Sequence, residues 1–67
     1  MITVWLNDAP RPVTPGQTVA QLLAALEVPP RGVAVAVNGE VVRRADWPEA
    51  RLAEGDRIEV LTAAQGG

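Results

Sequence analysis

The first apolar positions of the chain alternate with polar ones and predict a β-hairpin. Apolar side chains at every second position of residues 2–6 share one face, which is typical of a half-buried strand. Turn-forming residues follow at 7–10, and residues 11–14 predict a short second strand. Because its proline cannot donate a ladder hydrogen bond, we expect this strand at the edge of a sheet.

The spacing of apolar residues then changes to that of an amphipathic helix. Thr18 and Gln21 have the spacing of a capping box, which predicts the start of the helix. Pro29-Pro30 predicts its end near Glu27, since a residue before proline avoids the helical region. The apolar stripe follows the i, i+3, i+4, i+7 pattern and consists of Val19, Leu22, Leu23 and Leu26. We expect this stripe to pack against a sheet.

A second hairpin is predicted after the helix. Residues 33–37 are β-branched at every second position, and Asn38-Gly39 is the strongest short signal for a type I′ turn. Residues 41–43 would form the returning strand.

The last third of the chain predicts a connector and one more strand. Residues 45–50 would contain one helical turn, which Asp46 could cap. A turn at 53–56 leads into a strong strand signal at 57–61.

These elements predict an α+β fold. Their order is strand, strand, helix, strand, strand, strand, and the first and last strands suit a central, parallel pairing. A mixed four- to five-stranded sheet packed on one main helix is the β-grasp, or ubiquitin-like, architecture. We therefore expect a β-grasp domain at residues 1–61 and a flexible arm at 62–67.

Composition excludes most enzyme chemistries. The sequence contains no cysteine and no histidine, and its six basic residues are all arginine. Thiolate nucleophiles, imidazole bases and lysine amines are therefore absent. The net charge of −2 argues against a nucleic-acid partner, and the apolar runs are too short to predict a membrane span. With no signal-peptide pattern at its start, we expect a soluble, cytoplasmic protein.

The closing segment, Thr62-Ala63-Ala64-Gln65-Gly66-Gly67, is slim and carries no side-chain charge. Six extended residues reach roughly 20 Å, and glycine has no Cβ to hinder entry into a narrow channel. We expect this arm to present a free carboxylate on Gly67, and Ala64, Gln65 and Gly66 to thread into a partner.

Short motifs are spread over most of the chain. They are Leu6-Asn7, Gly16-Gln17-Thr18-Val19 with Leu22-Leu23, Ala36-Val37-Asn38, Val42 with Arg44 and Trp47, Leu52, Gly55-Asp56 with Ile58, and Gly66-Gly67. Together they resemble the ThiS family of thiamine-biosynthesis sulfur carriers. The spacing of Asn38, Arg44 and Trp47 points to the thiamine branch of this family, whereas Gly-Asp-x-Ile and the final Gly-Gly also occur in sister carriers. Arg43 departs from the proline that the family often has there.

The resemblance implies that the chain is a protein substrate and not an enzyme. Its terminal carboxylate on Gly67 would be adenylated and converted to a thiocarboxylate that donates sulfur to thiazole synthase. The sequence has no phosphate-binding loop and no thiol, so we expect no cofactor bound by the chain itself. ATP would be used by an E1-like adenylating enzyme, and sulfur would come from a cysteine desulfurase or another persulfide donor.

Docking residues are expected beside the arm, on the sheet face opposite the helix. Trp5 and Leu61 have the register of that face, and Glu59 could join Glu54 and Asp56 in an acidic group that attracts a basic partner. Trp47 is expected to pack in a small apolar cluster.

Two alternatives remain open at this point. The first is a sister carrier, either the small subunit of molybdopterin synthase or a carrier for tRNA thiolation. The second is a ubiquitin-like interaction module whose Gly-Gly end is incidental.

Overall fold

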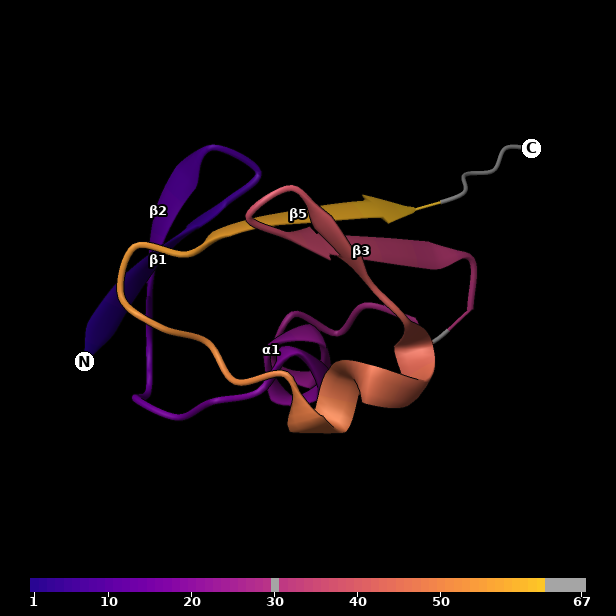
Figure 1. Cartoon of the computed structure of the whole chain (residues 1–67), viewed down its shortest axis with the longest axis horizontal. Helices are drawn as coiled ribbons and strands as arrows, with labels where there is room; N and C mark the ends of the chain where they lie inside the picture. The colour runs from indigo at the N-terminus through magenta and orange to yellow at the C-terminus, as the bar shows by residue number, and fades with distance from the viewer. Residues whose placement is uncertain (30, 63–67) are drawn as a thin grey trace.

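The computed structural model describes residues 1–29 and 31–62. In this part of the chain, a five-stranded mixed sheet packs against an α-helix and a 3-10 helix (Figure 1). The elements are β1 (Ile2–Leu6), β2 (Ala9–Val13), α1 (Val19–Ala25), β3 (Val33–Val37), β4 (Glu40–Val42), η1 (Arg44–Glu49) and β5 (Arg57–Thr62). The sheet order β2-β1-β5-β3-β4 confirms the predicted β-grasp fold.

The first and last strands lie side by side, as predicted. β1 and β5 run parallel, with Trp5 aligned with Arg57 and Leu6 with Ile58. On its other side, β5 pairs antiparallel with β3 over its last five residues. The strand that leads to the closing segment is therefore the central strand of the sheet.

The first hairpin has a tighter turn than the sequence suggests. Asn7 and Asp8 both have positive φ, at 49° and 69°, which is the geometry of a two-residue type I′ turn. Pairing therefore resumes at Ala9 opposite Leu6, and β2 begins two residues before its predicted start. As expected, β2 is an edge strand.

The capping box at the start of α1 is confirmed. The Thr18 hydroxyl accepts the Gln21 N–H at 3.2 Å, and the Gln21 carboxamide oxygen accepts the Thr18 N–H at 2.9 Å. α1 ends at Ala25, two residues before the predicted end near Glu27. Glu27 instead adopts a φ of 59°, and the Val28 N–H bonds to the Leu23 carbonyl at 3.1 Å, which completes a Schellman motif.

The second hairpin forms as predicted around Asn38 and Gly39, whose φ values are 53° and 84°. β4 begins at Glu40, one residue before its predicted start. The expected cap at Asp46 is wrong: η1 begins at Arg44, which places Asp46 within its first turn, and no side chain caps it.

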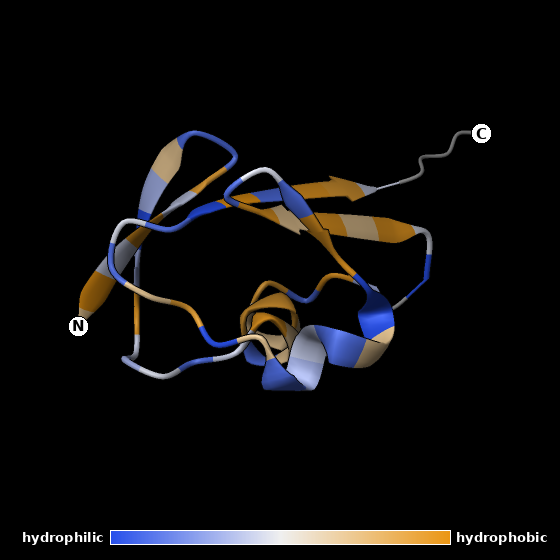
Figure 2. Cartoon of the chain, viewed as in Figure 1, coloured by the Kyte–Doolittle hydropathy of each residue, from blue (hydrophilic) through white to orange (hydrophobic). Residues whose placement is uncertain are grey.

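The apolar core lies between the sheet and the two helices. Figure 2 shows hydrophobic residues along the strands and α1 and hydrophilic residues in the turns. Trp47 packs in this core, as expected, and its indole N–H donates to the Val42 carbonyl at 3.0 Å. The buried residues are Val4, Val13, Val19, Leu22, Leu23, Val35, Trp47, Leu52 and Ile58. Within the described ranges, no helix is long and apolar enough to cross a membrane.

Candidate functional site

The candidate site begins where β5 leaves the body of the protein. β5 starts at Arg57, contributes Ile58 to the core and ends at the exposed Thr62. The strand thus runs one residue into the segment assigned to the arm. The predicted arm residues Ala64, Gln65, Gly66 and Gly67 lie outside the described residues.

The side chains of two turn residues bind the backbone of β5. Asn7 accepts the Val60 N–H at 2.9 Å through Oδ1 and donates to the Val60 carbonyl at 3.3 Å through Nδ2. Asn38 accepts the Arg57 N–H at 3.0 Å and donates to the Asp56 carboxylate at 3.0 Å. Both hairpin turns therefore hold the central strand, one near its start and one near its end.

The predicted docking residues share the open face of the sheet. Alternation along β5 turns Ile58 toward the helix and Glu59 and Leu61 away from it. Trp5 lies on this outer face of β1, so the expected orientation of Trp5 and Leu61 is confirmed by exposures of 44% and 64%. They are not neighbours, however: Trp5 aligns with Arg57, which is roughly 13 Å along β5 from Leu61.

Val41 lies on the same face of the sheet, although this position was not predicted from the sequence. It pairs with Ala36, which pairs in turn with Glu59, so these three residues form one row across β4, β3 and β5. Val41 is 77% exposed, the highest value of any valine, leucine or isoleucine in the described ranges. Alternation along residues 41–43 predicts that Val41 and Val42 face opposite sides of the sheet. Which of the two faces outward depends on the register in which β4 pairs with β3, and the sequence does not show this register.

Two of the three residues in the expected acidic group, Glu54 and Asp56, accept hydrogen bonds within the fold. The Glu54 carboxylate accepts the Thr3 N–H at 3.0 Å, and the Asp56 carboxylate accepts the Ala53 N–H at 2.8 Å as well as the Asn38 amide. Glu59 is exposed on the outer face. Arg57 on the same strand lies 3.6 Å from Asp8, and because both side chains are largely exposed this ion pair adds little stability.

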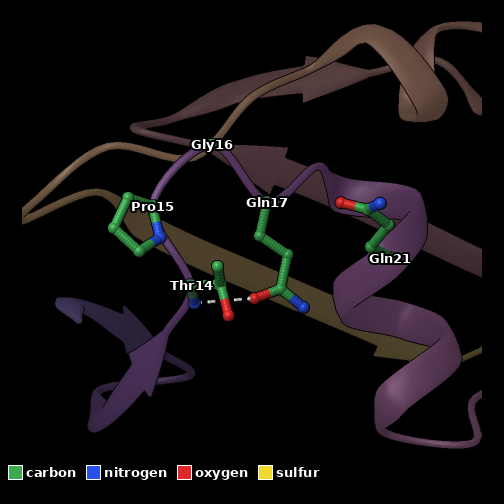
Figure 3. A pocket seen from close by; sticks show the side chains of 5 residues that line it. All are labelled: Thr14, Pro15, Gly16, Gln17 and Gln21. Atoms are coloured by element: carbon green, nitrogen blue, oxygen red, sulfur yellow. Dashed lines mark hydrogen bonds between the residues drawn. The ribbon is translucent and has the colours of Figure 1, made fainter.

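Two of the side chains that line a hollow between β2 and α1 make structural hydrogen bonds. Figure 3 shows its lining of Thr14, Pro15, Gly16, Gln17 and Gln21. The Gln17 carboxamide oxygen accepts the Thr14 N–H at 3.0 Å, while that of Gln21 takes part in the helix cap. These side chains therefore stabilise the turn into the helix. In the described part of the chain, no group of three acidic residues is placed to hold a metal ion.

Sequence comparison with known proteins identifies one family. A sequence model of the ThiS family matches residues 4–67. The chain is 41% identical to the sulfur carrier protein ThiS of Thermus thermophilus, covering 96% of this chain and 98% of that protein. It is 33% identical to the Escherichia coli sulfur carrier protein ThiS, covering 96% and 97%.

Solved structures give the same result. The crystal structure of the thiamine biosynthesis protein ThiS from Geobacter metallireducens superposes with a TM-score of 0.83 at 32% identity, covering 98% of this chain and all of that one. A solution structure of the Geobacter protein gives a TM-score of 0.82 over 98% of this chain and 88% of that one.

Proposed function

Because this chain belongs to the ThiS family, we propose that it is a sulfur carrier protein of thiamine biosynthesis. The observation that carries the proposal is the family match over residues 4–67, which includes the closing Gly66-Gly67. The fold supports it, because the strand that leads to these glycines is held at the centre of the sheet.

The proposed reaction begins at the carboxylate of Gly67. A carboxylate is a poor electrophile, because it is negatively charged and oxide is a very poor leaving group. An E1-like adenylating partner would join this carboxylate to the α-phosphate of ATP and release pyrophosphate. The resulting acyl-adenylate has AMP as a good leaving group. Since the reaction consumes ATP, we place it in the cytoplasm.

Sulfur would enter in the second step. A persulfide on a cysteine desulfurase, or on another donor, attacks the acyl carbon and displaces AMP, which forms an acyl disulfide. A second thiol then attacks the donor's cysteine sulfur and forms a disulfide with it, which releases the thiocarboxylate on Gly67. Thiazole synthase would accept this sulfur. In this scheme the chain is a protein substrate that binds no cofactor of its own.

The open face of the sheet is the proposed docking surface for these partners. Leu61 and Glu59 lie next to the exit of the closing segment, and Trp5 lies farther along the same face. A partner that covers this face would hold β5 while Ala64, Gln65 and Gly66 enter its active site. Glycine at 66 and 67 leaves the reacting carbonyl open to in-line attack, because neither residue has a Cβ.

A deletion strain tests the function. We expect a strain without this gene to require thiamine, and the full chain to restore growth where the chain lacking Gly67 does not. Intact-mass analysis of the purified protein should show oxygen replaced by sulfur only when the adenylating partner is present. Growth without thiamine, together with lost molybdoenzyme activity or lost tRNA thiolation, would contradict the proposal and favour a sister carrier.

A further inference from the structure

β5 receives different support on its two sides as it approaches its end. On one side β3 pairs with it as far as Thr62, which aligns with Val33. On the other side β1 ends at Leu6, which aligns with Ile58, four residues before Thr62. The chain of β1 then turns away through Asn7 and Asp8.

The Asn7 side chain extends the hydrogen bonding between β1 and β5 beyond the end of β1. The Asn7 backbone N–H donates to the Ile58 carbonyl at 2.9 Å, and its carboxamide then binds both the N–H and the carbonyl of Val60. A carboxamide carries the same donor and acceptor as a peptide group, so it can replace one residue of a neighbouring strand. At Val60, two residues before the end of β5, the strand therefore has a neighbour on each side: the Asn7 side chain, and β3, where Val60 aligns with Val35.

We propose that Asn7 is a positioning residue for the loading of Gly67, a role that rests on the function proposed above. Fixing β5 at Val60 sets the direction in which the chain leaves the sheet. Gly67 lies five residues beyond Thr62, at most roughly 18 Å away, so the position of the end of β5 limits the positions that the reacting carbon can reach. Without the carboxamide, a smaller fraction of molecules presents the terminus in the orientation that the adenylating partner accepts.

A positioning role for Asn7 predicts an effect on KM and not on kcat. Apparent affinity falls in proportion to the fraction of molecules in the competent orientation. Once the complex has formed, the partner itself holds the terminus, so the chemical step is unchanged. Because both hydrogen bonds are exposed, we expect KM to rise roughly threefold to tenfold, which corresponds to about 0.7–1.4 kcal/mol for the two bonds together.

The second turn supplies a matched control. Asn7→Gly and Asn38→Gly each keep a residue that accepts positive φ, and each removes one carboxamide that binds β5. They differ in position, because Asn38 holds Arg57 at the start of the strand and Asn7 holds Val60 near its end. Only the loss of the Asn7 carboxamide should alter the exit of the chain.

The experiment measures pyrophosphate release by the purified adenylating partner with full-length wild type, Asn7→Gly and Asn38→Gly as substrates. The temperature is chosen so that circular dichroism shows all three to be folded. We expect KM to rise roughly threefold to tenfold for Asn7→Gly and to stay within about twofold for Asn38→Gly, with kcat unchanged in both. Amide hydrogen exchange should independently show faster exchange at Val60 in Asn7→Gly.

An unchanged KM in Asn7→Gly, or an equal rise in both variants, would overturn the positioning role. If the wild-type chain were not adenylated at all, the proposed function itself would be contradicted. Failure of the positioning role and failure of the proposed function can therefore be told apart.

Discussion

Replacing Trp47 with phenylalanine tests how η1 is joined to the core. Trp47 is 7% exposed, and its indole N–H donates to the Val42 carbonyl at 3.0 Å. Phenylalanine removes this hydrogen bond, at about 1 kcal/mol, and the smaller ring removes roughly another 1 kcal/mol of buried apolar contact. We therefore expect the free energy of unfolding to fall by about 2 kcal/mol, out of a total of roughly 3–10 kcal/mol for a domain of this size.

Urea unfolding followed by far-ultraviolet circular dichroism measures this change. With a slope near 1 kcal/mol per molar urea, the midpoint should fall by about 2 M. The control is Trp5→Phe, which changes a 44% exposed ring on the outer face and should shift stability by less than about 0.5 kcal/mol. A Trp47→Phe shift no larger than that of Trp5→Phe would refute the role given to the indole.

Three other changes test the helix and the docking face. Glu27→Gly should raise the melting temperature by about 2–8 °C, because Glu27 has a φ of 59° at a position that favours glycine; a lower melting temperature would contradict the Schellman ending. Leu23→Ala should lower the free energy of unfolding by about 2–5 kcal/mol in chemical denaturation, and a wild-type midpoint would show that this side chain is not in the core. Leu61→Ser, at a 64% exposed site, should weaken binding to the adenylating partner in calorimetry without changing stability, and unchanged binding would remove Leu61 from the docking surface.

Features set by neighbouring residues could be predicted from the sequence. The Thr18–Gln21 capping box joins residues three apart, and the turn at Asn38-Gly39 depends on two adjacent residues. Both formed as predicted. The predicted end of α1 was two residues too late. Glu27 has a positive φ, and glycine is the residue that usually signals this conformation at the end of a helix. The cap assigned to Asp46 failed because η1 begins before it.

Features set by distant residues were not predictable in this way. Asn7 and Val60 are 53 positions apart, and their contact exists only because β1 and β5 meet in parallel at the centre of the sheet. The outward position of Val41 likewise depends on its alignment with Ala36. From the sequence, Asn7 is a good turn residue, and its second role in holding β5 is visible only in the assembled sheet.

The six residues of β5 divide into a part that stabilises the fold and a part that is available to partners. Ile58 is buried at the start of the strand, whereas Leu61 and Thr62 are exposed at its end. A change at Ile58 should therefore destabilise the whole domain, and a change at Leu61 should act on partners while the fold persists. The two turn asparagines bind the strand on either side of this division: Asn38 binds Arg57, next to the buried Ile58, and Asn7 binds Val60, next to the exposed Leu61.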